Sequence, residues 1–134
     1  MQRSRLRSIV FDCARPSALA RFWAEILGYR VRPYAEADIA RLRSAGIADV
    51  EDDPSVVIDP PGAGPTIWFD KVPEGKVVKN RVHLDVNLAS REELDRLVRL
   101  GARVLRPFDV VPEDRWAILA DPEGNELCAF PPEE

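Results

Sequence analysis

An imidazole and a carboxylate lie two residues apart in the segment Val82–Val86, whose alternating apolar residues predict a β-strand. His83, Asp85 and Asn87 would share one face of that strand, because side chains two residues apart point the same way. A carboxylate beside a partly shielded imidazole can move both proton affinities toward neutral pH, which makes a general acid or base. Asp12 would hold the matching place in the first half. The alternative is that the two aspartates only bind backbone or arginine, and that His83 is a structural imidazole.

Aromatic and sulfur-bearing side chains are expected on the same surface. Trp68 and Trp116 belong to predicted strands, and their flat rings can stack on a planar ligand. Asp70 follows Trp68 by two residues and therefore shares its face, and Glu126 has the same relation to Cys128. Cys128 is a candidate nucleophile where a neighbouring imidazole lowers the pKa of its thiol. The alternative for both tryptophans is that they pack in the core or between subunits. The alternative for Cys128 is that it is a buried, unreactive core residue.

The elements that position these residues follow a repeated order. Apolar periodicity and glycine or proline stops predict a β-α-β unit, a helical insert and two strands in the first half, and β-α-β-β-β in the second. The fold class is therefore α+β, with two βαβββ modules at about 6–72 and 81–131 in a single domain over 1–134. The modules would form a curved mixed sheet with the helices on its outer face. The predicted elements are strand 8–14, helix 16–27, strand 29–34, helix 38–45, strands 55–59 and 66–72, strand 82–86, helix 90–100, and strands 103–105, 116–120 and 126–130.

Two motifs carry a resemblance to a known family. The order of strand, helix and glycine, with the turn Asp121-Pro122-Glu123-Gly124-Asn125 in the last hairpin, resembles the vicinal oxygen chelate superfamily of glyoxalases, bleomycin resistance proteins and extradiol dioxygenases. Phe22–Gly28 resembles its first helix, and Lys79–Asp85 resembles its glyoxalase-like branch. The resemblance covers nearly the whole chain. It implies the fold above and a cleft for a small molecule, but it leaves the reaction open, because isomerases, dioxygenases and drug-sequestering proteins share this scaffold.

The resemblance also implies four positions for the ligands of a divalent metal, normally His or Glu. In this sequence those positions hold Ser8, Asp70, His83 and Cys128. Because a serine hydroxyl is a poor ligand and three of the four residues depart from the pattern, we expect no tightly bound metal cofactor. A zinc site of His83, Cys128 and Asp70 is the alternative, since zinc accepts nitrogen, thiolate and carboxylate together.

The residues fit both an enzyme and a binding protein. We expect a glyoxalase-like isomerase or lyase that works without a metal, with His83 and Asp85 as the catalytic pair. The alternative is a bleomycin-resistance-type protein that sequesters a planar compound, and a second alternative is a metal-dependent glyoxalase or dioxygenase. In each case the substrate or ligand would contact Asp12, Trp68, Asp70, Trp116, Glu126 and Cys128.

Composition limits the class of partner. The 134 residues carry a net charge of -4, which argues against nucleic acid, because phosphate binding needs a surplus of basic side chains on one surface. No apolar run approaches the length of a membrane span or signal peptide, so we expect a cytoplasmic protein without a membrane partner. The two cysteines, Cys13 and Cys128, are expected as free thiols. A homodimer is expected because an open curved sheet leaves edges that a second copy can cover.

Overall fold

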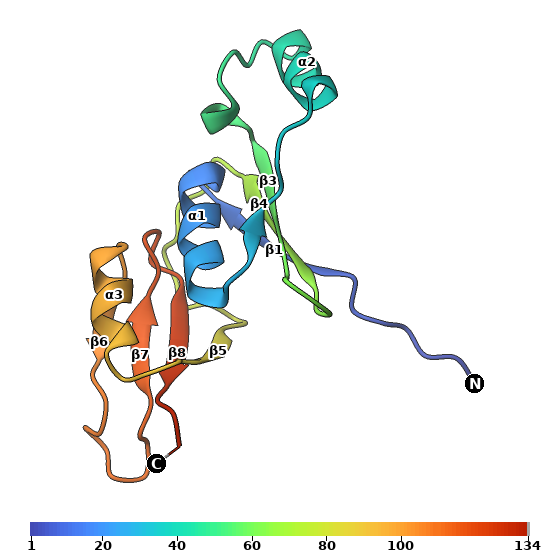
Figure 1. Ribbon diagram of the computed structural model, residues 1–134. Helices are drawn as coiled ribbons and strands as arrows, with labels where there is room; N and C mark the ends of the chain where they lie inside the picture. The colour runs from blue at the N-terminus through green and yellow to red at the C-terminus, as the bar shows by residue number, and fades with distance from the viewer. Residues whose placement is uncertain (134) are drawn as a thin grey trace. The chain divides into compact units, whose positions relative to one another are not determined.

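The computed structural model describes residues 1–133 and divides into two compact units, unit 1 (Met1–Gly75) and unit 2 (Lys76–Glu134). Each unit contains one four-stranded mixed β-sheet with helical segments (Figure 1). The strand and helix order in each unit is that of a βαβββ module, which confirms the predicted α+β class. The boundary between the units falls in the segment 73–80, where the sequence has no regular period.

Unit 1 is built around a sheet with the strand order β1-β4-β3-β2. Strands β1 and β4 are parallel, and the other two pairs are antiparallel. A helical insert, α2 with a short 3-10 helix η1, separates β2 from β3, and Figure 1 shows α2 standing away from the sheet. The elements are β1 (Ser8–Cys13), α1 (Pro16–Leu27), β2 (Arg30–Val31), α2 (Glu36–Ser44), η1 (Val50–Asp52), β3 (Ser55–Asp59) and β4 (Thr66–Lys71).

Helix α1 packs its apolar stripe on one face of this sheet. Pro16 opens the helix, where its missing N–H costs nothing, and Gly28 closes it in the left-handed conformation with φ 66°. Trp23 is the central contact, at 1% exposure. Its ring centroid lies 5.2 Å from that of Phe11 on β1, which in turn lies 5.3 Å from that of Phe69 on β4. Burial of this face leaves the alternate residues of β1 and β4 on the opposite face.

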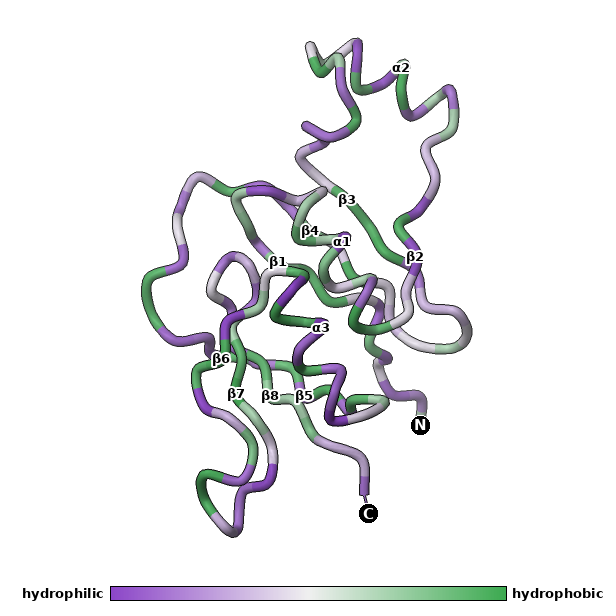
Figure 2. Tube along the Cα trace, turned by 60° about the vertical axis from the view of Figure 1, so that its left-hand side comes forward, coloured by the Kyte–Doolittle hydropathy of each residue, from purple (hydrophilic) through white to green (hydrophobic). Residues whose placement is uncertain are grey.

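Strand β2 is shorter than the sequence predicted. It pairs with β3 over only two residues, and one further bond follows, from the Arg32 N–H to the Val57 carbonyl. The next residue is Pro33, which has no N–H to donate to a ladder, so the strand ends there. Strand β3 itself is apolar throughout its middle, and the hydrophobic run is visible along β3 in Figure 2; it consists of Val56, Val57 and Ile58, all buried.

Unit 2 repeats the arrangement with the strand order β5-β8-β7-β6, in which β5 and β8 are parallel. Its β7–β8 hairpin turns at the acidic motif noted in the sequence. The buried carboxylate of Asp121 accepts hydrogen bonds from the N–H groups of Glu123 and Asn125, both at 2.9 Å, and Gly124 takes a φ of 90°. The motif is therefore a turn closed by its own aspartate. The elements are β5 (Leu84–Asn87), α3 (Glu93–Arg99), β6 (Arg103–Arg106), β7 (Ala117–Ala120) and β8 (Glu126–Phe130).

Two sequence predictions for unit 2 were wrong in detail. The strand predicted from residue 82 begins two residues later, at Leu84, and Val82 is 77% exposed. The helix predicted from residue 90 begins three residues later, at Glu93. Residues 90–92 form a turn in which the Ser90 carbonyl accepts a hydrogen bond from the Glu93 N–H, and the side chain of Glu92 makes no cap bond.

Within residues 1–133 no helix combines the length and the apolar composition that crossing a membrane requires.

Candidate functional site

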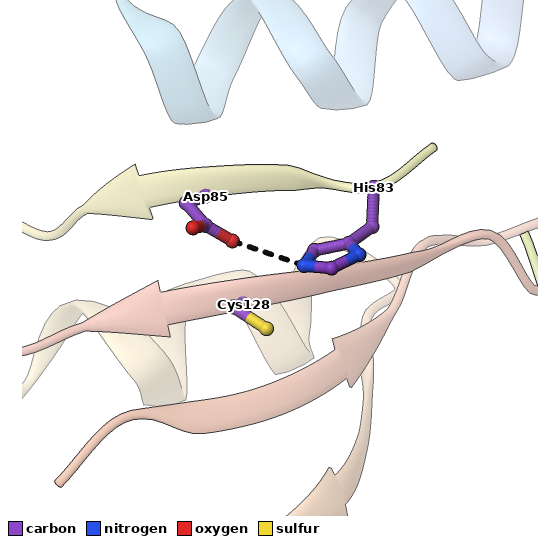
Figure 3. A group of neighbouring side chains, drawn as sticks. All are labelled: His83, Asp85 and Cys128. Atoms are coloured by element: carbon purple, nitrogen blue, oxygen red, sulfur yellow. Dashed lines mark ion pairs between the residues drawn. The ribbon is translucent and has the colours of Figure 1, made fainter. Parts of the chain in front are cut away.

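His83 and Asp85 lie on the same side of the β5 segment in unit 2. His83 is the residue directly before β5, and Asp85 is the second residue of the strand. Val86 is buried on the opposite face, as the two-residue alternation of a strand requires. His83 Nε2 lies 3.3 Å from Asp85 Oδ1, and the two side chains remain 42% and 57% exposed (Figure 3). A small molecule can therefore reach both groups.

Cys128 joins this pair from the neighbouring strand. It is the register partner of Asp85 in the parallel β5–β8 pairing, which places the two side chains on one face. One ligand atom of each residue, the imidazole nitrogen of His83, a carboxylate oxygen of Asp85 and the Cys128 sulfur, lies within 4.8 Å of the other two. The three groups together offer a proton acceptor, an anion that can orient it, and a thiol.

The Cys128 thiol is held in its protonated form. Its pKa is raised, first because partial burial disfavours the thiolate, and then because the negative charge of Asp85 and a hydrogen bond to that carboxylate act in the same direction. The positive charges of Arg106 and Lys79 lower the pKa but do not reverse the shift. A nucleophilic role would need the thiolate, so this environment argues against Cys128 as the nucleophile.

The raised pKa predicts slow alkylation of Cys128. At pH 8, iodoacetamide should react with it more slowly than with glutathione, because only the thiolate reacts. Asp85→Asn removes one cause of the raised pKa and should accelerate the reaction, whereas Asp95→Asn, an exposed carboxylate of α3, should leave it unchanged. Mass spectrometry of the separated peptides distinguishes Cys128 from the buried Cys13. Equal rates in wild type and Asp85→Asn would contradict the influence of Asp85.

Glu126 shares the face of Cys128 but is already engaged by the chain. Its carboxylate accepts a hydrogen bond from the Asn80 N–H at 3.0 Å and forms an ion pair with Lys76 Nζ at 3.1 Å. The Asn80 bond is the largest cause that lowers the pKa of Glu126. Through these two contacts Glu126 stabilises the segment that leads into β5. That segment carries His83, so Glu126 also supports the position of the imidazole.

Trp116 lies directly before β7 and packs against Phe130, which was not among the predicted site residues. Its ring stacks on Phe130 at a centroid distance of 5.3 Å, and the Arg106 guanidinium lies 5.3 Å from the Trp116 ring centroid. Phe130 was detectable, since it continues the alternation of Glu126 and Cys128 along β8. Arg106 was not, because its approach depends on an irregular pairing of β6 with β7. Trp116 as a whole is only partly buried.

The predicted site residues of the first half lie together on the open face of the unit 1 sheet. Asp12 and Asp70 are register partners on β1 and β4. The Ser55 hydroxyl donates to Asp70 Oδ1 at 2.6 Å. The Arg32 guanidinium lies 5.7 Å from the Trp68 ring centroid, and Trp68 also lines a pocket of about 200 Å³. Ser55 and Arg32 were missed, because neither stands in a recognisable pattern.

The group of possible metal ligands differs from the set expected from the sequence. Asp85 supplies the carboxylate beside His83 and Cys128, and all three belong to unit 2. Asp70, the carboxylate proposed from the sequence, belongs to unit 1. The donor set of imidazole nitrogen, carboxylate oxygen and thiol sulfur fits zinc, which accepts all three, better than manganese, which prefers oxygen.

A model of the glyoxalase-like domain family matches residues 8–130, which is most of the chain. The chain belongs to this family. No curated protein matches the sequence. The glyoxalase-like assignment agrees with the two βαβββ modules and with the acidic turn in the last hairpin.

Solved structures share this glyoxalase-like fold at low sequence identity. The fosfomycin resistance protein FosX from Mesorhizobium loti matches with a TM-score of 0.63 and 10% identity, over 98% of this chain and 94% of that chain. A glyoxalase/bleomycin resistance protein/dioxygenase family enzyme from Burkholderia phytofirmans PsJN matches with 0.59 and 17%, over 94% and 97%. A FosX mutant from Listeria monocytogenes, complexed with Mn(II) and 1S,2S-dihydroxypropylphosphonic acid, matches with 0.61 and 13%, over 96% and 90%. Similarity at this level establishes the fold and not the reaction.

Proposed function

We propose that this glyoxalase-like protein is an enzyme that moves a proton at a carbon next to a carbonyl group of a small molecule, as an isomerase or lyase. The observation that carries the proposal is the 3.3 Å contact between His83 Nε2 and Asp85 Oδ1 on an open face of unit 2. A positioned imidazole with an orienting carboxylate is the usual apparatus of general base catalysis.

In the proposed reaction each nitrogen of His83 has its own role. Nε2 carries its proton toward Asp85, which leaves the lone pair of Nδ1 to accept a proton from the substrate carbon. The C–H bond breaks, its electron pair passes into the carbonyl group as an enolate, and the imidazole becomes positively charged. Asp85 then stabilises the imidazolium. Return of the proton to the opposite face of the same carbon completes an isomerisation. In a lyase step the enolate electron pair instead forms a C=C bond to the next carbon, and the group that leaves from that carbon takes the proton of the imidazolium.

Positive charge on the same unit supports the enolate. The charges of Arg106 and Lys79 both act on the Cys128 thiol, so their fields reach the surface that holds His83 and Asp85. A cation near a developing enolate oxygen stabilises the transition state more than the neutral substrate. The aromatic pair of Trp116 and Phe130 offers an apolar contact for the rest of the substrate.

Deuterium exchange tests the proposal with a panel of compounds in place of a single chosen substrate. Small α-hydroxycarbonyl and α-keto compounds would be incubated with the protein in D₂O, and loss of the proton next to the carbonyl would be followed by NMR. We expect at least one compound to exchange faster than in buffer alone. Binding of these compounds, seen as tryptophan quenching, with no exchange in any of them would favour the ligand-sequestering alternative.

A metal-dependent reaction is the second candidate, because His83, Asp85 and Cys128 place three ligand atoms within 4.8 Å of one another. Three protein ligands with a further position open are typical of catalytic zinc. When bound, zinc would supply Lewis-acid polarisation of a substrate carbonyl. The protein's own contribution would be to hold the ion and to give up the thiol proton of Cys128.

Zinc binding to this group should depend on pH. Because the pKa of Cys128 is raised, the ion must displace a proton from the thiol, and the affinity should be higher at pH 8 than at pH 6. At a zinc concentration of 100 times Kd, the stabilisation is about 2.7 kcal/mol. Thermal unfolding with zinc or manganese measures it, and Cys128→Ser should abolish the effect of zinc. Equal stabilisation of wild type and Cys128→Ser would exclude this site.

A further inference from the structure

Unit 1 has a pocket of about 370 Å³ at the beginning of helix α1. Residues 14–18 and 51–53, together with Arg21 and Lys71, form its wall, so the pocket lies between the start of α1, the helix η1 and the end of β4. Neither His83 nor Asp85, the proposed catalytic pair, takes part in it. Its size is enough for a small metabolite.

The start of α1 offers hydrogen-bond donors that the helix itself does not use. Pro16 has no N–H, and the Leu19 N–H donates to the Arg15 carbonyl at 3.0 Å. The N–H groups of Ser17 and Ala18 are therefore the two in the first turn without a partner inside the helix. No side chain caps the helix at Arg15, and its first turn contains no acidic residue. The positive end of the helix dipole is thus left for a ligand.

Ser17 gives an independent indication of a ligand. It is a polar residue at only 8% exposure, and in the described part of the chain no hydrogen bond involves its side chain. A buried hydroxyl is normally paired. Ser17 is one of the residues that line the pocket, so a ligand held there can supply the hydrogen-bond partner that the chain does not.

The charged side chains of the wall are compatible with an anion. Glu51 is held by the Arg21 guanidinium through two contacts of 2.7 Å. The buried Asp53 accepts hydrogen bonds from the Tyr34 hydroxyl at 2.7 Å and from the Ser55 N–H at 3.0 Å. These two carboxylates are therefore already satisfied by donors of the chain. Lys71 ends β4 at the wall and is exposed, and Asp52 is an exposed carboxylate that opposes it.

We propose that this pocket is a binding site for the oxyanion group, carboxylate or phosphate, of a small metabolite. The anion accepts hydrogen bonds from the N–H groups of Ser17 and Ala18 and from the Ser17 hydroxyl, and Lys71 supplies the positive charge. All of these groups belong to unit 1, and the proposal does not depend on the reaction assigned to His83.

Titration with simple anions tests the site on the full chain. Inorganic phosphate and acetate would each be added to ¹⁵N-labelled protein at constant ionic strength, with chloride as the reference, and the amide signals followed by NMR. We expect saturable shifts of Ser17 and Ala18 with at least one oxyanion, and the stronger binder of the two identifies the group that the site takes. Ser17→Ala should weaken binding about tenfold, since it removes a hydrogen bond to a charged group.

Charge variants give a second readout. Lys71→Gln should weaken the binding of the same anion and Asp52→Asn should strengthen it, while Ser44→Ala, which removes an exposed serine of α2, should have no effect. Ser17→Ala keeps a good helix former at its position, so the fold is retained. Shifts at these amides that are the same with chloride, or that Ser17→Ala and Lys71→Gln leave unchanged, would overturn the proposal.

Discussion

His83→Ala should reduce the rate of carbon–deuterium exchange by about 10²–10⁴-fold, the usual contribution of a positioned general base. The reason is that the Nδ1 lone pair of His83 is the proton acceptor in the proposed reaction, and residues 1–133 contain no second histidine to replace it. The measurement is the exchange rate of an active compound in D₂O, with wild type and variant compared at the same protein concentration.

Asp85→Asn separates orientation from proton transfer. The amide keeps the shape of the side chain but cannot stabilise the imidazolium that forms beside it, so the rate should fall by less than in His83→Ala. Asp95→Asn, an exposed carboxylate of α3, is the matched control and should keep the wild-type rate. An unchanged rate in both His83→Ala and Asp85→Asn would remove these residues from the mechanism.

Trp23→Ala should cost about 3–5 kcal/mol of the free energy of unfolding, the range found for deletion of a large buried aromatic side chain. Trp23 is 1% exposed, and its ring contacts those of Phe11 and Phe22 at centroid distances of 5.2 and 6.0 Å. The loss would leave a cavity between α1 and the unit 1 sheet. Urea denaturation followed by circular dichroism gives the free energy.

Two further variants keep this prediction testable where Trp23→Ala fails to fold. Trp23→Phe retains a ring in the core and should cost less, and Leu105→Ala, at an exposed position of β6, should change the free energy by no more than about 0.5 kcal/mol. A urea midpoint of Trp23→Phe equal to that of wild type would mean that Trp23 does not anchor the core.

Local patterns in the sequence were enough to predict most of the helices and strands. Alternation placed β3 and β8 at their observed bounds, and the apolar stripe between Pro16 and Gly28 gave the whole of α1. The acidic turn was also predictable, because Asp121 satisfies the N–H groups of its own loop. These features depend on residues close together in the chain, and their physics is therefore local.

The composition of the site was only partly predictable, because its contacts join distant residues. Alternation puts His83 beside Asp85, but the position of Cys128 next to them follows from the parallel register of β5 with β8. No pattern in one strand specifies that register. The same holds for Glu126, whose face was predicted correctly while its contacts with Lys76 and the Asn80 N–H depend on the path of a segment without regular structure.

The central claim, that His83 and Asp85 move a proton without a metal, is tested most directly by exchange in the presence of a chelator. Wild-type protein would be treated with EDTA, its zinc and manganese content measured, and its exchange rate compared with that of His83→Ala. We predict that the metal-free wild type keeps its full rate and that His83→Ala loses it. A rate that disappears with the chelator and returns on addition of zinc would contradict the claim and establish the His83, Asp85 and Cys128 group as a metal centre.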